Sequence, residues 1–262
     1  MRIRLVVAAL VSVLSLLVGA APAHAGGPGL LSMTFNACGN VCRHGEVDLT
    51  ASNIAYQVRA RGVSVAMLQE LCYSQFLGVR DRLARYGYEA IFATGAKGGH
   101  CADHDRAHGR AFGIALLAKG TLSGAVAHQL IGTSPVNAEQ RMVLGATVRL
   151  AGRTVFAVTT HTSPSGPNLA AQMAAISRWL TPLAGTRPVL FGGDLNSQPS
   201  DDDLDPFYAT FREANGDRSE PLTTFLPAPR KIDYLFANLG RRGAVTSCAA
   251  YSDHCMYFGL FR

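Results

Sequence analysis

The sequence consists largely of short apolar runs of β-strand type, many of which follow one another directly. The first run is "LLSMTFNA", which begins at Leu30, and the last is "CMYFGLF", which ends at Phe261. Runs of this kind, separated by glycines, prolines and polar residues, are typical of strands. Strands that follow each other without an intervening helix usually pair with antiparallel neighbours. The pattern therefore predicts mainly antiparallel sheets.

Three segments between these runs have the apolar spacing of helices, and they cover 51–62, 74–87 and 168–185. Asp48 or Thr50 is expected to cap the first of these helices. The chain has no internal repeat, no long low-complexity tract and no linker that would divide it. Two sheets packed face to face, with the helices on the outside, are the architecture that this pattern predicts.

The first 25 residues have the composition of a secretory signal peptide. Arg2 and Arg4 give a short positive start, 5–19 is apolar, and "AHA" ends at Ala25 with the small residues that signal peptidase reads. A membrane anchor is the alternative, but the apolar run is shorter than the roughly 20 residues that span a bilayer. We therefore expect export, with cleavage after Ala25.

Residues 26–262 are expected to form one single domain. A chain of this length is long enough for one large hydrophobic core. Loss of Arg2 and Arg4 would lower the formal net charge from +6 to +4. This mild excess of basic residues is compatible with a polyanionic partner but does not require one.

All six cysteines follow the predicted signal peptide. An even number of cysteines in an exported chain indicates three disulfides, although six cysteines allow fifteen connectivities. Local spacing favours the pairs Cys38–Cys42, Cys72–Cys101 and Cys248–Cys255. A metal site is disfavoured as the alternative, because no CxxC pair is present and export favours oxidation.

Polar side chains stand at the ends of several apolar runs. These residues are Asn36, Glu70, His161, Asp194, Asn196, Asp233, Asp253 and His254. Taken singly, an aspartate after a strand is usually a turn residue or a helix cap. Strand ends are rigid, however, and polar side chains on them can converge on one rim of a pair of sheets. Taken together, these residues fit one chemical task.

That task is the metal-assisted hydrolysis of a phosphate ester. Glu70 and Asp253 offer hard oxygen ligands for Mg²⁺, Mn²⁺ or Ca²⁺, and Asn36 offers a neutral carbonyl oxygen. Asp194 is suited to orient and deprotonate a water molecule. Asn196 is suited to hold Asp194 or a phosphate oxygen.

The two histidines supply the remaining functions that such a site needs. A lone histidine beside an aliphatic run is more often part of the core than a catalyst. Here His161 and His254 are suited to donate to non-bridging phosphate oxygens or to transfer protons. Asp233 can fix the tautomer of one of them by accepting from its second ring nitrogen.

At these residues the sequence closely resembles the endonuclease/exonuclease/phosphatase superfamily, which has the fold of pancreatic-type deoxyribonuclease. The matching motifs are "TFNA", "LQE", "THTSP", "GGDLNSQP", "KIDYLF" and "SDH", in the family's order from Thr34 to His254. Any one of them alone is a weak match, but six in order are specific to the superfamily. The chain resembles a secreted bacterial-type member.

The resemblance implies a four-layer α/β sandwich with two mainly antiparallel mixed sheets and a divalent-metal site at one rim. Mg²⁺ is the metal expected first, with Mn²⁺ or Ca²⁺ as alternatives. The implied ligands are Asn36, Glu70 and Asp253. Asp194 and Asn196 are implied at the position of the attacking water.

The same resemblance makes His161 and His254 the phosphate-side histidines, with Asp233 as the partner of His254. In the nucleases of this family, the histidine at the position of His161 pairs with an acidic residue from the middle of the chain. The segment "HGRAFGIALL" carries no acid at that place.

Two arginines are candidates for phosphate contact. Arg141 lies before the strand that leads to His161, where deoxyribonuclease-like members carry a phosphate-contacting arginine. Arg110 opens another strand near the expected site. The forked guanidinium of arginine matches a phosphate group, and a solvated surface charge is the alternative for both.

The segment 96–110, "AKGGHCADHDRAHGR", is rich in residue types that bind metals. They are His100, Asp103, His104, Asp105 and His108. The glycines, the expected anchoring by Cys101 and the lack of a strict ligand pattern favour a solvated, substrate-facing loop over a second metal site.

Fold and metal leave the substrate open, since the superfamily also contains sphingomyelinases, inositol-polyphosphate phosphatases and abasic-site nucleases. The basic charge and Arg141 favour a nuclease that acts on DNA or RNA. A phospholipid phosphodiesterase should carry an exposed aromatic-aliphatic hairpin for membrane entry, and only the short "TFLPAPRK" stands in for one. A phosphomonoesterase is the other alternative. We expect a secreted, monomeric, metal-dependent phosphodiesterase without stable membrane association.

Overall fold

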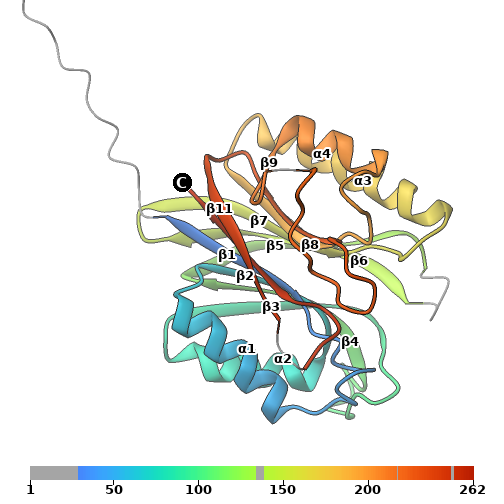
Figure 1. The fold of residues 1–262 in the computed structure, drawn as a ribbon. Helices are drawn as coiled ribbons and strands as arrows, with labels where there is room; N and C mark the ends of the chain where they lie inside the picture. The colour runs from blue at the N-terminus through green and yellow to red at the C-terminus, as the bar shows by residue number, and fades with distance from the viewer. Residues whose placement is uncertain (1–28, 134–138, 217, 249–250) are drawn as a thin grey trace, which may run out of the picture.

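The computed structural model describes residues 29–133, 139–216, 218–248 and 251–262, so the predicted signal peptide lies outside the described residues. Two six-stranded sheets form the centre of the molecule (Figure 1). The first has the order β11-β12-β1-β2-β4-β3, and the second has the order β5-β6-β7-β8-β10-β9.

The strands of the first sheet are β1 (Leu30–Asn36), β2 (Val65–Cys72), β3 (Tyr88–Lys97), β4 (Ala111–Lys119), β11 (Arg241–Ser247) and β12 (Met256–Phe261). Those of the second are β5 (Thr121–Thr133), β6 (Gln140–Leu150), β7 (Arg153–His161), β8 (Val189–Asp194), β9 (Arg212–Glu213) and β10 (Asp233–Ala237). Only β1–β2 and β7–β8 pair in parallel among the described strands. The expectation of mixed, mainly antiparallel sheets is confirmed.

Helices form the two outer layers (Figure 1). Helices α1 (Asp48–Arg61) and α2 (Tyr73–Ala84) cover the first sheet, and α3 (Pro167–Ala184) and α4 (Asp205–Thr210) cover the second. A short 3₁₀ turn, Asp202–Leu204, leads into α4. The apolar residues divide accordingly into one core between the two sheets and one core under each helical layer. The four-layer sandwich is therefore confirmed.

The predicted cap of the first helix is wrong. The helix begins after Val47, which makes no side-chain cap, and both Asp48 and Thr50 lie in its first turn. The Glu46 carboxylate takes the capping role, because it accepts hydrogen bonds from the backbone nitrogens of Leu49 and Thr50 at 2.8 and 3.1 Å. An acidic side chain is favourable at this end of a helix.

The disulfide pairing agrees with the prediction from spacing. The structure joins Cys38 to Cys42, Cys72 to Cys101, and Cys248 to Cys255. The second of these bonds connects the end of β2 to the loop that precedes β4. Among the residues described, no helix is long and apolar enough to cross a membrane.

The two parallel strand pairs place the site-bearing strand ends at one rim. Because β1 runs parallel to β2 and β7 parallel to β8, the carboxyl end of each strand lies beside that of its partner. Strand β10 runs antiparallel to β8, and β12 runs antiparallel to β1, so both begin where their partners end. Just inside this rim, Gln69 of β2 donates to Thr159 of β7 at 3.0 Å and links the two sheets.

A buried ion pair lies beneath the rim. The Lys231 ammonium is 3.3 Å from the Glu213 carboxylate, and both side chains are 1% exposed. Tyr257 donates its hydroxyl to the same carboxylate at 2.7 Å, and its ring lies 3.6 Å from the ammonium. Lys231 also donates to the backbone oxygen of Asp233 at 3.0 Å. Burial lowers the pKa of Lys231, and the carboxylate opposes that effect.

This pair predicts a large loss of stability when one partner is removed. We expect Glu213→Gln to lower the free energy of unfolding by about 3–5 kcal/mol, because it leaves a buried ammonium without its carboxylate. The double variant Glu213→Gln/Lys231→Met should recover part of this loss. Denaturant unfolding measures both values. Asp81→Asn, which breaks the exposed Arg80–Asp81 pair, is the control and should cost about 0–1 kcal/mol. A similar cost for Asp81→Asn and Glu213→Gln would contradict the prediction.

Candidate active site

A cleft of about 340 Å³ opens at the rim where the strand ends meet. Of the polar residues singled out in the sequence, those that line it are Asn36, Glu70, Arg141, His161, Asp194, Asn196, Asp253 and His254. Asp233 is fully buried behind His254. Residues that are up to 218 positions apart in the chain, as Asn36 and His254 are, therefore share one cavity.

Strand register aligns three of these residues in one row across the second sheet. His161 at the end of β7 pairs with Asp194 at the end of β8, and Asp194 pairs in turn with Asp233 at the start of β10. Gly193 has φ +148°, and a Cβ there would collide with the Thr160 carbonyl oxygen. The glycine before Asp194 thus lets β7 and β8 come close enough to set this row.

Three non-glycine residues of the cleft have left-handed backbone conformations. These are Cys38 (φ +46°), Glu70 (φ +56°) and Asn196 (φ +50°). Glu70 lies in an irregularity of the β2–β4 pairing between Leu68 and Leu71. Such strain is rare outside glycine and concentrates at functional sites, where it re-aims side chains.

The Asp194 carboxylate accepts hydrogen bonds on both of its oxygens. Oδ2 lies 3.0 Å from Nδ2 of Asn36, 3.4 Å from Nε2 of His161 and 3.6 Å from Nε2 of His254. Oδ1 accepts from the backbone nitrogen of Asn196 at 3.0 Å. Burial alone would raise the pKa of Asp194, but the two histidines and Asn36 outweigh it and hold the pKa far below its usual range. Asp194 is thus an anion at neutral pH.

His254 is held by a second buried carboxylate. Its Nδ1 lies 2.8 Å from Oδ2 of Asp233. Burial alone would lower the pKa of His254, but Asp233 and Asp194 raise it to about 10. The ring is therefore an imidazolium at neutral pH, with its Nε2–H group directed toward Asp194. Asp233 does pair with His254, as the resemblance implies.

His161 contacts an arginine at Nδ1, and not the acidic residue that the resemblance implies there. Nη1 of Arg141 lies 2.6 Å from Nδ1 of His161 and 3.0 Å from the Glu139 carboxylate. Nη1 also lies 3.2 Å from Nε2. Because a guanidinium can only donate, the closer nitrogen, Nδ1, is assigned as the acceptor, and this assignment leaves the proton on Nε2. That proton points toward Asp194 and toward Glu70, whose Oε1 is 3.8 Å from Nε2.

Glu139 is a residue that sequence reasoning missed. Its side chain and that of Arg141 are both 4% exposed. The two residues are separated by one position at the start of β6, and alternate residues of a strand point to the same face. That alternation in "EQR" is the signal that could have identified the pair.

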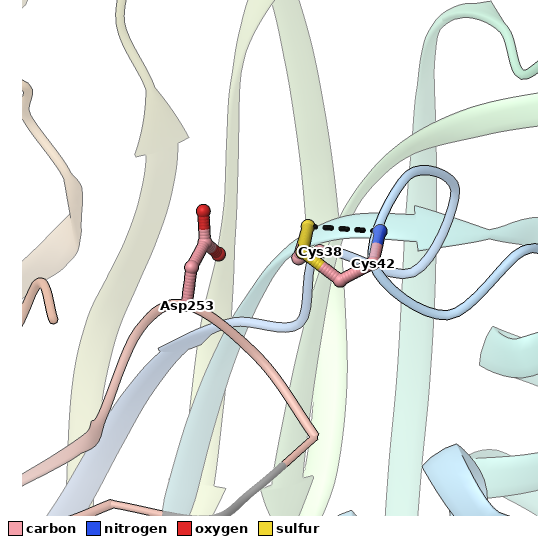
Figure 2. A group of neighbouring side chains, drawn as sticks. All are labelled: Cys38, Cys42 and Asp253. Carbon is pink, nitrogen blue, oxygen red and sulfur yellow. Dashed lines mark hydrogen bonds between the residues drawn. A yellow bond between two sulfur atoms is a disulfide. The ribbon is translucent and has the colours of Figure 1, made fainter. Parts of the chain in front are cut away.

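Two carboxylates in the cleft have the chemistry of ligands for a hard divalent cation. Burial raises the pKa of Glu70, Glu139 and Asp194 raise it further, and His161 and Asn36 offset only part of the effect. A cation beside Glu70 would relieve this repulsion. Asp253 reaches the same cleft from the loop before β12, beside the Cys38–Cys42 turn (Figure 2). The two cysteines are disulfide-bonded, so the carboxylate is the only free ligand of that group.

Asn36 is oriented as a bridge between carboxylates. Its Nδ2 donates to Glu70 at 3.1 Å and to Asp194 at 3.0 Å, while its Oδ1 accepts from the backbone nitrogen of Cys38 at 3.0 Å. Binding a cation through Oδ1 would require rotation of the carboxamide by half a turn. Glu70 and Asp253 line the same cleft and have the ligand type that a divalent metal prefers, and the ligand roles of Asn36, Glu70 and Asp253 stay predictions.

The two arginines predicted to contact phosphate lie in different places. Arg141 lines the cleft, whereas Arg110 does not and instead donates from Nε to the Cys101 carbonyl at 2.9 Å. The geometry gives no support for a phosphate contact by Arg110. Arg230, which sequence reasoning did not single out, lines the cleft together with Phe225.

The histidine-rich loop behaves as the solvated segment that was expected. His108 stacks on Tyr73 with ring centroids 3.8 Å apart, and its Nδ1 lies 2.9 Å from Asp105. Within the described ranges, no group of three close metal-ligating side chains occurs in this loop.

The fold agrees with comparisons to known proteins. The model of the "Endonuclease/Exonuclease/phosphatase family" matches residues 33–254. Among curated proteins, no sequence matches significantly. Solved structures resemble the chain at low identity, which shows the fold alone.

Three of these structures illustrate the likeness. An endonuclease/exonuclease/phosphatase from Bacteroides vulgatus has a TM-score of 0.67 at 15% identity, over 90% of this chain and 99% of that one. The human Nocturnin catalytic domain, solved with a bound sulfate anion, has a TM-score of 0.71 at 19% identity, over 90% and 93%. A humanized D. rerio TDP2 has a TM-score of 0.65 at 16% identity, over 89% and 99%.

Members of the matched family are phosphoesterase hydrolases that generally depend on a divalent metal. The family model covers most of the chain. The chain belongs to the endonuclease/exonuclease/phosphatase family.

Proposed function

We propose that residues 26–262 form a secreted, divalent-metal-dependent phosphodiesterase that hydrolyses nucleic acid, with DNA as the first substrate and RNA as the second. The observation that carries this proposal is the Asp194 carboxylate, which faces Nε2 of both His161 and His254 in a cleft that also contains Glu70 and Asp253. These side chains provide an anion that can accept a hydrogen bond from the attacking water and two donors for the phosphate oxygens. They also provide two carboxylate ligands for a hard metal ion. The three disulfides support export.

In the proposed reaction, the scissile phosphate lies between the two histidines. Nε2–H of His161 and Nε2–H of His254 donate to its oxygens, and Asp194 accepts a hydrogen bond from the attacking water. Glu70 and Asp253 would hold a divalent cation, which would supply Lewis-acid stabilisation of charge on the phosphate. Buried, preorganised donors of this kind are effective because they need no reorganisation when charge develops.

The proposed proton transfers use Asp194 and His254. As the water oxygen bonds to phosphorus, its proton passes to Asp194. The bond from phosphorus to the leaving oxygen breaks, and that oxygen takes a proton from Nε2 of His254. Asp194 then returns its proton to His254, since Oδ2 and Nε2 are 3.6 Å apart. Water and diester thereby yield a monoester and an alcohol.

A phospholipid phosphodiesterase is the second candidate. Val41, which lines the cleft, is 63% exposed, and Leu226, which follows Phe225 of the cleft, is 41% exposed. Exposed apolar side chains at the mouth of a site are suited to a lipid as well as to a base. The exposed Arg230 in the same cleft favours the nucleic acid, because a strand offers more than one phosphate. We propose a monomer without stable membrane association.

One assay separates these substrates. The mature chain, with Mg²⁺, Mn²⁺ or Ca²⁺, is incubated with plasmid DNA, RNA, sphingomyelin and a phosphomonoester. We expect cleavage of DNA or RNA, read by gel electrophoresis. Asp194→Asn, which keeps the shape of the side chain and removes its charge, is the control for contaminating nucleases. Lipid cleavage without nucleic-acid cleavage would overturn the proposed substrate.

The catalytic roles predict large losses of rate. We expect His161→Ala, Asp194→Asn and His254→Ala each to lower kcat at least about 10²-fold, the range typical of acid–base groups. Initial rates on DNA measure this, and melting temperatures check that each variant folds. Near-normal turnover in a folded variant would refute the role of that residue.

If Glu70 binds the metal, Mg²⁺ should raise the melting temperature of the protein, and this rise should depend on Glu70. We expect EDTA to abolish activity, and Mg²⁺ at about 100 times its dissociation constant to stabilise the protein by about 2.7 kcal/mol. Glu70→Gln should lose most of this Mg²⁺-dependent shift, because an amide is a weaker ligand than a carboxylate. Glu46→Gln, a change outside the cleft, is the control. An unchanged shift in Glu70→Gln would exclude Glu70 as a ligand.

The Asp233–His254 pair predicts a pH dependence of stability for the metal-free protein. Folding raises the pKa of His254 from about 6.5 to about 10, so its contribution is complete below about pH 6.5 and is lost as the pH rises to about 10. Denaturant unfolding in EDTA should show a loss of up to about 1.4 kcal/mol per pH unit in this window. Asp233→Asn should flatten the slope. Equal slopes in the wild type and in Asp233→Asn would show that Asp233 does not raise the pKa of His254.

A further inference from the structure

The segment Phe225 to Arg230 is hydrogen-bonded to the loop that carries Asp253 and His254. Leu226 donates its backbone N–H to the Asp253 carbonyl at 2.9 Å, and Cys255 donates to the Thr224 carbonyl at 2.7 Å. Phe225 also donates to the Arg230 carbonyl at 3.0 Å, which closes the segment on itself. Its backbone is therefore positioned by the same loop that carries Asp253 and His254.

The Arg230 side chain extends from this segment into the cleft. Its guanidinium carbon lies 5.0 Å from the centroid of the Phe225 ring, and that ring lies 5.0 Å from the His254 ring. The guanidinium is thus no more than 10.0 Å from the imidazole of His254. Phe225 acts as a spacer that holds the cation beside the reaction centre.

Arg230 and Arg141 are the two arginines that line the cleft, and their surroundings differ. Arg141 is buried and paired with Glu139 and His161. Arg230 is exposed, and none of the carboxylates that the structure describes lies within 4.0 Å of it. Arg141 is therefore bound to the catalytic residues, whereas Arg230 has its five donors available to a ligand.

A polynucleotide can use a cation at this distance. One strand of a duplex carries a charge roughly every 3.4 Å along the helix axis, so a strand with its scissile phosphate at His254 has another phosphate within reach of Arg230. A phospholipid or a simple phosphomonoester offers a single phosphate, which the histidines already contact. The forked guanidinium suits a phosphate oxygen pair.

We propose that Arg230 binds the phosphate next to the scissile one and so makes the cleft select a polynucleotide over a substrate with a single phosphate. This inference rests on the proposed function and assigns a binding role to a residue outside the family motifs identified in the sequence. Arg230 contributes to binding the strand and takes no part in proton transfer.

The test compares a dinucleoside monophosphate, which has one phosphate, with a decanucleotide of the same sequence type. We expect Arg230→Gln to lower kcat/KM on the decanucleotide about 10-fold through KM, and on the dinucleotide less than about 3-fold. The slope of log kcat/KM against log salt should become shallower by about 0.7, the value for one phosphate contact on a single strand. Arg230→Lys keeps the charge and loses the forked guanidinium, so its kcat/KM on the decanucleotide should lie between those of Arg230→Gln and the wild type.

Arg59→Gln is the matched control. Arg59 is also an exposed arginine with no carboxylate within 4.0 Å among the described residues, but it lines a hollow between α1 and α2 and not the cleft. It should change neither the rates nor the salt slope. Equal losses for Arg230→Gln on both substrates, or no loss on either, would overturn the role of Arg230. Failure of the wild type to cleave either nucleotide substrate, with cleavage of sphingomyelin or a monoester, would instead overturn the proposed function.

Discussion

A buried carboxylate that must remain ionised is the constraint on which the rest of the site depends. Asp194 is 2% exposed, and burial by itself favours its neutral form. Its charge is retained because donors from three distant parts of the chain reach it, Asn36, His161 and His254, and the backbone of nearby Asn196 also donates to it. Each donor must arrive in the correct register. The strand pairing of both sheets is therefore a condition for the charge at the centre of the cleft.

The charged side chains around Asp194 form three levels between the protein interior and the opening of the cleft. The carboxylates face the cavity, where burial and mutual repulsion make a divalent cation favourable beside Glu70. Below them, the Lys231–Glu213 pair supports the backbone of Asp233 from the interior. Above them, Arg230 stands exposed at the mouth. The interior pair contributes to geometry and stability, whereas the outer cation is available to a substrate.

The sequence could predict those features that depend on residue type and local spacing. Apolar runs located most of the strands, helical spacing located three helices, and the short separations of the cysteines indicated their pairing. Polar residues after the runs pointed to one rim, and eight of them line the cleft or lie directly behind it. The capping role of Glu46 was missed because its long side chain reaches forward past the positions where a cap is expected.

Tertiary structure alone decided which side chains meet. Nothing in "EQR" states that Arg141 contacts His161, because that contact depends on how β6 and β7 pair side by side. Arg230 lines the cleft because its segment is hydrogen-bonded to the backbone of Asp253. Arg110 does not line the cleft, and its guanidinium donates to the Cys101 carbonyl instead. The sequence by itself determined the chemical types and the order of the residues along the chain. Long-range register and docking then determined their partners, since hydrogen bonds form between atoms that are close in space whatever their separation in sequence.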